Sequence, residues 1–593
     1  MQGLVERARR DPGGVMLVAA LLVAAALYAP TLSRGLINYD DPWLVGENWM
    51  LQHPSPSTLH SIFFDLHSPQ RFLLLGAEYL PVRDLSIMGD FAIWGDWYPG
   101  FHITNLVLYL AAIGLWFAAL TRFGIDRKLV GIAILLWALH PAHAESVAWI
   151  TERKGLLGLA FAGTCALGYA RFRRGGGVGY LALAMLAAVC AVWSKAPAAF
   201  AVGALAGLEL VLPRSRVSWR RSLVGLVAIG TVAAAAFVPV VLLARANAIV
   251  GTETPLPVGR IELVLGVHGF YLRSAAMAIR NAVSYPLSIH GPSAFDIALG
   301  VCGLALLVAL AVVPRRGRWK PPEAIRVGAI LWLFGWLPVS YLVLPLQRMF
   351  VADRYLLFPT LGTSLVVAAG IVRLTRPSIR RALIAAIALA AMLRSLDAQS
   401  SWSSPRNLWA RAVESNPDDG NAWAMYVESL AGDREKAEAA LAEALHHSNN
   451  PRLLMRQALS VLDSDRTRGI ELMRRAAEGG EPIAMSNLAL LLLADGAQEE
   501  ALSWARRGAV LRPNAHAQRT LGKVALAMHH GDEALSAFGR ALDLEPTCAN
   551  RFNFALALVE LDRRAEARPH LEACASDPVL GIRIRQLRDS LSP

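Results

Sequence analysis

Charged residues are scarce in this sequence. Only 18% of the 593 residues are Asp, Glu, Lys or Arg, while 55% are apolar and the mean hydropathy is +0.40. A soluble globular domain carries about 25% charged residues, so the composition excludes a single soluble domain. It is typical of a membrane protein with many spans, and a length beyond about 300 residues favours more than one domain.

Long apolar runs occupy the first two thirds of the chain. They predict an all-α polytopic membrane bundle of about eleven spans, at residues 15–33, 101–121, 129–140, 155–171, 179–194, 196–212, 222–243, 294–314, 325–346, 355–373 and 379–396. No convincing small-residue cleavage site follows the first run, so we expect an uncleaved anchor. Near residue 397 helices rich in Ala, Leu, Glu and Arg replace the apolar runs. This change predicts a membrane domain at 1–396 and a second domain at 397–593.

Basic residues gather in every second loop. A cytoplasmic N-terminus places on the inside Arg122, Arg127, Lys128, Arg171, Arg173, Arg174, Arg214, Arg216, Arg220, Arg221, Arg315, Arg316, Arg318, Lys320, Arg373, Arg376, Arg380 and Arg381. The positive-inside rule favours this orientation, which puts the domain at 397–593 outside the cytoplasm. The net charge of +12 then reflects loops that face anionic lipids rather than nucleic-acid binding.

This orientation requires the segment 261–283 not to cross the membrane. Arg273 and Arg280 stand at helical spacing within it, which suits an amphipathic helix. We therefore expect a helix over 261–283 that lies at the outer interface.

The domain at 397–593 has the period of tetratricopeptide repeats. The clearest unit consists of Leu521, Gly522, Ala534, Phe538, Ala541 and Pro546. Ala501 and Ala567 lie 33 residues to either side of Ala534, and weaker units fall at Ala437 and Ile470, which predicts about five helical hairpins in an α-solenoid. Such arrays bind partners on a concave face or serve as spacers, and the sequence leaves both functions open.

The five cysteines bear on the compartment. Cys165, Cys190 and Cys302 lie in apolar spans, where a cysteine is usually a small packing residue. Cys548 and Cys574 lie at opposite ends of the last predicted hairpin. Two interpretations remain equal: an extracytoplasmic disulfide, or a Cys574 that replaces the repeat's small alanine.

Two adjacent carboxylates open the first outer loop, which spans 34–100. The stretch "GLINYDDPWLVGEN" places Asp40 and Asp41 before Pro42, in a loop with eight acidic residues and three arginines. A structural interpretation is a turn that caps the next helix, since Asp before Pro is a turn signature. A functional interpretation is catalysis, because a cap needs one carboxylate and a general base could be the other.

The stretch "HPAHAESVAWITERKGLL" concentrates ionisable residues at an outer span end. Charge is costly at that depth, so function or access to water is expected. A set of His140, His143 and Glu145 is a candidate metal site, yet its spacing differs from the HExxH pattern. The alternatives are helix packing or positioning of an acceptor, and Glu152 belongs to the same group of candidates.

Four cations recur at outer span ends: Arg153, Lys154, Lys195 in "WSKAPA" and Arg354 in "ADRYLLFP". Snorkelling side chains are common at such positions. Cations from several segments that meet at one membrane face also suit a lipid-linked phosphate, which needs charged donors there.

Together these motifs carry a resemblance. In order, "INYDDPWLVGEN", "YLPVRDLSIMGDFAIWG", "PGFHITNLVLYL", "HPAHAESVAWITERK", "WSKAPA" and "DRYLLFP" precede the repeats. This order resembles the transmembrane and tetratricopeptide-repeat O-mannosyltransferases and their bacterial relatives, which are GT-C type glycosyltransferases. The sequence departs from them at Leu80, where relatives often have Arg, and at Gly155, where many have Asp.

The resemblance implies a glycosyltransferase in a bacterial inner membrane. Its donor would be a sugar on a polyprenyl phosphate, its acceptor a protein or another envelope molecule, and its repeats would lie in the periplasm. Asp40 or Asp41 would be the catalytic base, and a divalent metal is left open. The expected ligands of the donor phosphate are Arg83, Arg153, Lys154, Lys195 and Arg354. The alternative is a non-enzymatic scaffold, or a lipid-linked-sugar transporter, whose repeats recruit envelope partners.

Overall fold

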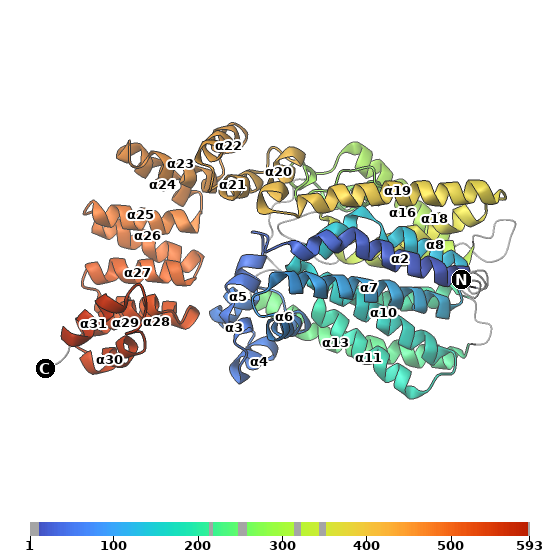
Figure 1. The fold of residues 1–593 in the computed structure, drawn as a ribbon, viewed down its shortest axis with the longest axis horizontal. Helices are drawn as coiled ribbons and strands as arrows, with labels where there is room; N and C mark the ends of the chain where they lie inside the picture. The colour runs from blue at the N-terminus through green and yellow to red at the C-terminus, as the bar shows by residue number, and fades with distance from the viewer. Residues whose placement is uncertain (1–10, 213–216, 247–257, 313–321, 343–350, 591–593) are drawn as a thin grey trace. The chain divides into compact units, whose positions relative to one another are not determined.

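The computed structural model describes residues 11–212, 217–246, 258–312, 322–342 and 351–590 (Figure 1). These residues form helices and turns, and no strand occurs among them. They divide into two compact units. The bundle unit comprises residues 1–67 and 74–416, and the repeat unit comprises residues 68–73 and 417–593. The boundary at 416 lies later than the change in composition near residue 397.

A helix of the bundle unit overlaps each expected span. They are α2 (Pro12–Tyr28), α7 (Tyr98–Phe123), α8 (Arg127–Ala138), α10 (Arg153–Arg173), α11 (Val178–Ser194), α12 (Ala198–Val211), α13 (Trp219–Ala246), α16 (Ala294–Val312), α17 (Glu323–Trp336), α18 (Pro359–Val372) and α19 (Pro377–Ser401). Shorter helices connect them: α3 (Trp49–Gln52), α4 (Pro56–Phe63), α6 (Pro81–Trp94), α9 (Ala144–Ala148), α14 (Arg260–Ala275), α15 (Leu287–His290) and α20 (Pro405–Ser415).

Fewer helices than expected are long and apolar enough to cross a membrane. Within the described residues, five helices are long and apolar enough to cross a membrane, or six if the bent pair of α8 with Pro141–Ala148 counts as one. The apolar helices α11, α12 and α18 have 17, 14 and 14 residues, which is short of the ~20 that a bilayer needs. The predicted count of eleven is therefore not confirmed.

The prediction of a helix over 261–283 is wrong for the last third of that segment. Helix α14 ends at Ala275, because Met277 adopts a left-handed backbone with φ 57°. The Ala278 N–H then donates to the Arg273 carbonyl oxygen at 2.9 Å, a common way to close a helix. Arg280 lies beyond the helix and pairs with Glu414 at 2.7 Å.

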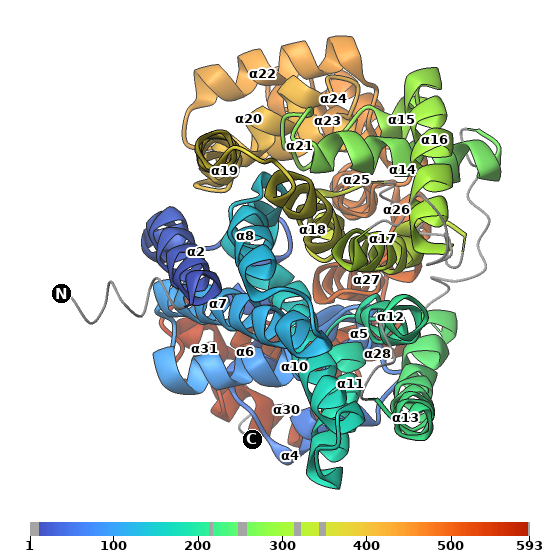
Figure 2. The same cartoon turned by 90° about the vertical axis from the view of Figure 1, so that its right-hand side faces the viewer.

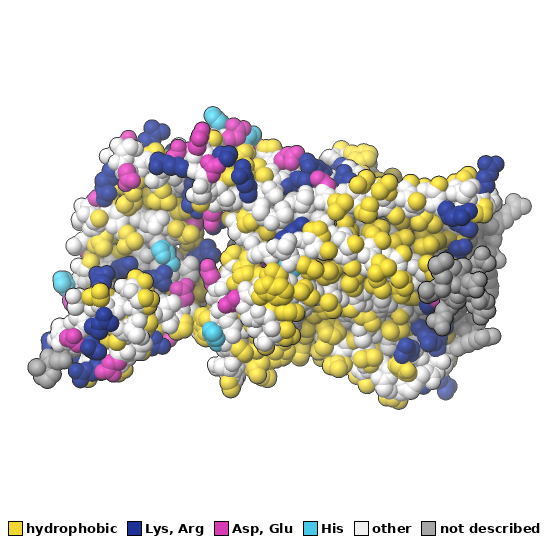
Figure 3. Space-filling model, in the orientation of Figure 1, with side chains coloured by type: hydrophobic (Ala, Val, Ile, Leu, Met, Phe, Trp, Pro, Cys, Tyr) yellow, Lys and Arg dark blue, Asp and Glu magenta, His cyan; other side chains and the backbone are white. Residues whose placement is uncertain are grey.

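The bundle helices share a common direction. Viewed along the bundle, α2, α8, α18 and α19 appear end-on (Figure 2). Hydrophobic side chains cover the flank of this unit, and Lys and Arg side chains gather at its right-hand end (Figure 3). Helices α3, α4 and α6 of the outer loop lie at the opposite end (Figure 1). One end of the bundle is thus basic, and the other carries the outer loop.

The repeat unit consists of five helical hairpins and a last helix. The paired helices are α21 (Gly420–Ser429) with α22 (Arg434–His447), α23 (Pro451–Val461) with α24 (Arg466–Glu478), α25 (Pro482–Ala494) with α26 (Gln498–Leu511), α27 (Ala515–Ala527) with α28 (Gly531–Leu544), and α29 (Cys548–Glu560) with α30 (Arg564–Glu572), followed by α31 (Gly581–Ser590). Ala501, Ala534 and Ala567 are fully buried in the second helices. Small residues at this period let the helices approach closely, as the sequence predicts.

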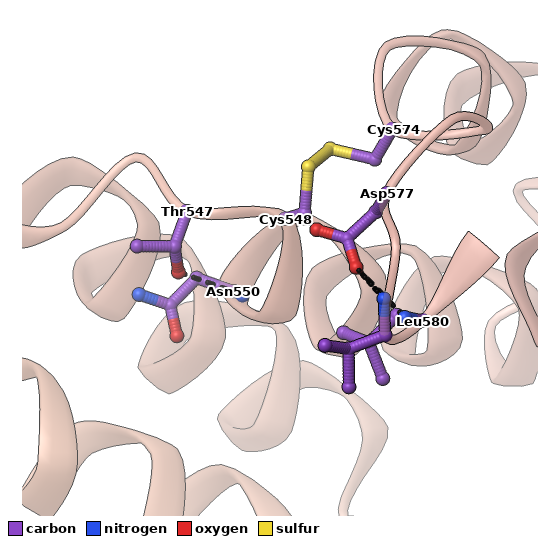
Figure 4. Close-up of a disulfide and its surroundings, with 7 residues drawn as sticks. Thr547, Cys548, Asn550, Cys574, Asp577 and Leu580 are labelled. Carbon is purple, nitrogen blue, oxygen red and sulfur yellow. Dashed lines mark hydrogen bonds between the residues drawn. A yellow bond between two sulfur atoms is a disulfide. The ribbon is translucent and has the colours of Figure 1, made fainter.

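The last hairpin is cross-linked. Cys548, at the start of α29, forms a disulfide with Cys574, just after α30, and their Cα atoms are 5.5 Å apart (Figure 4). The sequence left two interpretations of this pair equal, and the structure agrees with the disulfide. Cys165, Cys190 and Cys302 form no disulfide within the described residues.

Candidate functional site

Asp41 is a buried link between two distant segments. Its side chain is fully buried, and the Ile37 N–H donates to Oδ2 at 3.0 Å. Thr151 donates to Oδ1 from its backbone N–H at 3.0 Å and from its hydroxyl at 2.5 Å. Burial raises the pKa of Asp41 to about 6, against the opposing effect of these hydrogen bonds. Asp41 therefore holds the start of the outer loop against residue 151.

Asp40 differs from its neighbour in exposure. Its side chain is half-buried, and the indole N–H of Trp43 donates to its Oδ1 at 3.2 Å. Among the described residues no Lys or Arg forms an ion pair with it. Of the two adjacent carboxylates, Asp40 is the more exposed.

A cavity opens in the bundle unit among helices α10, α12 and α17 and the segment that leads into α18. Its wall is mainly apolar and is formed by Gly155, Gly158, Leu159, Ala162, Pro197, Ala198, Ala201, Gly335, Val339, Tyr355, Leu357 and Phe358. Two cations, Lys195 and Arg354, complete the lining. We call it the two-cation cavity. A Cβ atom on Gly155 would lie 2.6 Å from Glu152 Oε1 and 3.4 Å from the Lys195 ammonium, so the glycine leaves room for the Glu152 carboxylate beside this cation.

Each cation of the two-cation cavity has a glutamate partner. Arg354 Nη1 lies 2.5 Å from Glu145 Oε1, and the Arg354 backbone N–H donates to Glu145 Oε2 at 2.9 Å. Lys195 forms an ion pair with Glu152, which is fully buried. Both glutamates come from the ionisable stretch before α10. The structure thus places Glu145 and Glu152 as partners of the cations.

The remaining predicted cations differ in their surroundings. Lys154 pairs with Glu78 of the outer loop. Arg153 and Arg83 are buried: Arg153 lies 2.5 Å from Asp90, and Arg83 lies 2.6 Å from Asp84. Arg153 also donates to the Phe101 carbonyl oxygen at 2.9 Å, and Arg83 to the Leu75 carbonyl oxygen at 2.7 Å. The ion pairs of Lys154 and Arg153 tie the outer loop to α10, whereas the contacts of Arg83 lie within the outer loop.

The two histidines take part in separate hydrogen bonds. His143 contacts the Tyr109 hydroxyl at 2.8 Å and the Thr360 hydroxyl at 2.9 Å. His140 contacts the Ala275 carbonyl oxygen at 3.1 Å. Within the described residues no three His, Cys, Asp or Glu side chains are grouped to hold a metal ion, so the metal interpretation of His140, His143 and Glu145 gains no support here.

Tyr39 connects Asp40 with the two-cation cavity. Its ring packs against Trp149 with centroids 4.9 Å apart, and the Arg354 guanidinium lies 5.8 Å from the centroid of the Trp149 ring. Burial raises the pKa of Tyr39, the Arg354 charge lowers it, and the Asp40 charge raises it. Both charged groups therefore lie within electrostatic range of Tyr39.

Several residues of this site were not predicted. The quoted motifs contain Tyr39, Trp149 and Thr151, but nothing in these residue types indicated that they contribute to a site. Glu78 pairs with Lys154. The only sequence signal for this pair is that Glu78 belongs to an acidic loop and Lys154 is a cation. Gly155 borders the two-cation cavity, at a position where many members of the family that the sequence resembles have Asp.

Comparisons with known proteins identify no family. No family model matches the sequence, and no curated protein matches it. A crystal structure of the APC/C hetero-tetramer Cut9–Hcn1 is 13% identical, with 91% of this chain and 99% of that chain covered and a TM-score of 0.28.

An Archaeoglobus fulgidus oligosaccharyltransferase is also similar in two crystal structures. The apo form is 13% identical over 70% of this chain and 59% of that chain, with a TM-score of 0.39. The form tethered by a disulfide to an acceptor peptide with the NVT sequon is 15% identical over 73% and 59%, with a TM-score of 0.37. The alignment thus spans a little over half of that enzyme's length, and scores this low decide neither fold nor function.

Proposed function

We propose that this protein is a membrane glycosyltransferase that moves a sugar from a polyprenyl phosphate carrier to a protein or envelope acceptor. The reaction takes place at the extracytoplasmic face of a bacterial inner membrane. The two-cation cavity is the observation that carries the proposal. An apolar wall with two cations at it suits a ligand with a hydrocarbon chain and an anionic head, as a lipid phosphate has.

The cations have a direct role in this reaction. Lys195 and Arg354 bind the phosphate oxygens of the donor and stabilise the charge that grows as the phosphate leaves. Glu152 and Glu145 hold them in place before the donor enters, because a buried cation without a partner is costly. Lys154, paired with Glu78 near the same end, is the next candidate for contact with the donor head group.

Asp40 is the proposed general base. It accepts the proton of the acceptor hydroxyl while the hydroxyl oxygen forms a bond to the anomeric carbon of the sugar. The bond from that carbon to the phosphate oxygen breaks, and its electron pair leaves with the polyprenyl phosphate. Attack from the face opposite the phosphate inverts the configuration. Asp41 keeps the loop in position through Ile37 and Thr151.

The charge pattern and the last hairpin support this location. Basic side chains gather at one end of the bundle unit (Figure 3), as expected for a cytoplasmic face. A disulfide in the repeat unit suits an oxidising compartment outside the cytoplasm. The repeats then present an acceptor or partner protein on the same side of the membrane as the outer loop.

A transfer assay tests the proposal. Proteoliposomes receive polyprenyl phosphates that carry mannose, glucose or N-acetylglucosamine, with envelope proteins as acceptors. We expect transfer from at least one donor, and a loss of about 100-fold or more for Asp40→Asn, the usual scale for a positioned base. Glu47→Gln is the matched control, since Glu47 is an exposed carboxylate of the same loop and should retain the wild-type rate. Transfer by none of the donors, or wild-type transfer by Asp40→Asn, would refute the proposal.

Binding separates the cations from the base. Polyprenyl phosphate without a sugar serves as the probe. Lys195→Ala and Arg354→Ala should weaken its binding at least tenfold, while Asp40→Asn should bind it as the wild type does. Equal binding by all variants would remove the two cations from the donor site.

A further inference from the structure

The last two helices of the bundle unit reach the loop that carries Asp40. The indole N–H of Trp409, in α20, donates to Asn38 Oδ1 at 2.8 Å. The Trp409 ring also meets Tyr39 edge-on, with centroids 5.6 Å apart. Asn38 and Tyr39 are the two residues before Asp40. One side chain of α20 therefore fixes both residues that precede the proposed base.

A second tryptophan, which directly follows the last residue of α19, supports the same loop. Trp402 stacks on Trp149 with centroids 5.6 Å apart and an angle of 21° between the ring planes. Trp149 in turn packs against Tyr39. Trp149, Trp402 and Trp409 are each no more than 5% exposed. The rings of Trp409, Tyr39, Trp149 and Trp402 form a continuous row, in which the positions of α20 and the loop depend on each other.

Helix α19 is anchored to the rest of the bundle near this row. The Gln399 side-chain amide donates to the Leu27 carbonyl oxygen at 2.7 Å, and the Ser395 hydroxyl donates to the Leu139 carbonyl oxygen at 2.7 Å. Arg34, at the root of the outer loop, donates to the Gln399 carbonyl oxygen at 3.1 Å. The base of the loop and α19 are thus held as one body.

Ion pairs continue this anchoring into α20. Arg411 Nη2 lies 2.9 Å from Asp397 Oδ1, which joins α20 to α19. The Asn416 side chain donates to the Ser284 hydroxyl at 3.0 Å. Arginine with a carboxylate in a two-pronged contact resists rotation. Trp409 therefore projects from a helix whose C-terminal half is held by these contacts.

We propose that Trp409 is a positioning residue for Asp40: its hydrogen bond to Asn38 and its contact with Tyr39 hold the Asp40 carboxylate where it accepts the acceptor proton. This inference rests on the proposed function. The Asp40 carboxylate accepts one hydrogen bond, from Trp43 at 3.2 Å, so its own contacts define its place less firmly than the three hydrogen bonds to the Asp41 carboxylate. The residues before it supply the missing constraint. Misplacement of a catalytic group by about 1 Å can cost on the order of 100-fold in rate.

The experiment compares Trp409→Phe with Asn38→Ala in the proteoliposome assay. Phenylalanine retains the ring and removes the indole donor, and alanine removes the same hydrogen bond from the loop side. Each variant should lower kcat about tenfold or more, with the KM for the lipid donor within about twofold of wild type. If Trp409→Phe fails to fold, Asn38→Ala still tests the hydrogen bond. Trp423→Phe is the matched control, because Trp423 is also buried and donates to the Pro417 carbonyl oxygen at 2.7 Å within the repeat unit.

A third variant distinguishes positioning from general support of the fold. In an Asp40→Asn background, Trp409→Phe should cause no further loss of the residual rate, because it acts through the missing carboxylate. A full additional loss, or wild-type kcat for both single variants, would overturn the inference. If Asp40→Asn itself retains wild-type transfer, the proposed function fails first. If Asp40→Asn is inactive while Trp409→Phe and Asn38→Ala are unaffected, only the role of Trp409 fails.

Discussion

Charge is placed differently in the two units. In the bundle unit the ion pairs of Arg153, Arg354 and Lys195 have side chains no more than 11% exposed. In the repeat unit Arg506 pairs with Glu533 at 54% and 28% exposure, and Arg434 pairs with Glu438 at 88% and 55%. A buried pair needs good geometry to offset desolvation, whereas an exposed pair contributes about 0–1 kcal/mol. The comparison therefore separates charges that the bundle depends on from charges that mainly keep the repeats solvated.

The largest expected effect concerns the side of the membrane on which each region lies. A reporter fused after residue 400 should be active outside the cytoplasm, and one fused at residue 318 should be active only inside, because the basic loops set orientation. Activity of fusions in whole cells measures this, with a periplasmic and a cytoplasmic reporter at each site. The opposite pattern would place the outer loop and the two-cation cavity on the wrong side for the proposed reaction.

Loss of a buried pair should affect stability most. Arg153→Ala removes the partner of Asp90 and the donor to the Phe101 carbonyl oxygen, so we expect a loss of about 3–5 kcal/mol in the free energy of unfolding. Thermal unfolding of the detergent-purified protein measures the change. Arg506→Ala, the exposed counterpart in the repeat unit, should cost no more than about 1 kcal/mol. Similar losses for both variants would erase the contrast between the units.

The disulfide gives the repeat unit its own source of stability. Cys548→Ser opens a loop with a sequence separation of 26, and the expected loss in the free energy of unfolding is about 3 kcal/mol. Mass mapping without reductant should find Cys548 linked to Cys574. Cys302→Ala, which breaks no disulfide, is the control. Recovery of Cys548 and Cys574 as free thiols would instead favour the interpretation in which Cys574 is a small packing residue.

A smaller effect depends on pH and belongs to the bundle unit. Burial raises the pKa of Asp41 from 3.8 to about 6. The folded protein then binds a proton that the unfolded chain has released, so stability falls as pH rises from about 4 to 6, by up to about 3 kcal/mol. Unfolding measured across this range should show the slope. Asp41→Asn should remove it, whereas Asp40→Asn, which leaves Asp41 in place, should retain it. A slope that survives Asp41→Asn contradicts the assignment.

The sequence predicted the helices better than the contacts between them. Apolar runs mark the longer bundle helices because hydropathy is a local property, and the 33-residue spacing of Ala501, Ala534 and Ala567 marks the hairpins. The count of spans was less predictable, since run length does not say where α11, α12 or α18 ends. Helix α14 ends early, at Ala275, because Met277 adopts a left-handed backbone, and methionine is a residue type that gives no warning of this conformation.

The candidate site was predicted as a set of residues but not as an arrangement. Glu145 and Arg354 are 209 residues apart, so no spacing pattern could pair them. Asp40 and Asp41 have the same chemistry and adjacent places in the chain. Thr151, which lies 110 residues from Asp41, decides that Asp41 is the buried one. Only the tertiary structure could separate their roles.

The cross-link in the last hairpin also gives the repeat array a direction. In a linear array each hairpin is supported by its neighbours, so the two terminal hairpins fray most readily. A covalent loop between Cys548 and Cys574 closes one of these two starting points. Spontaneous opening of the array should then begin at α21 and α22 and progress toward the C-terminus.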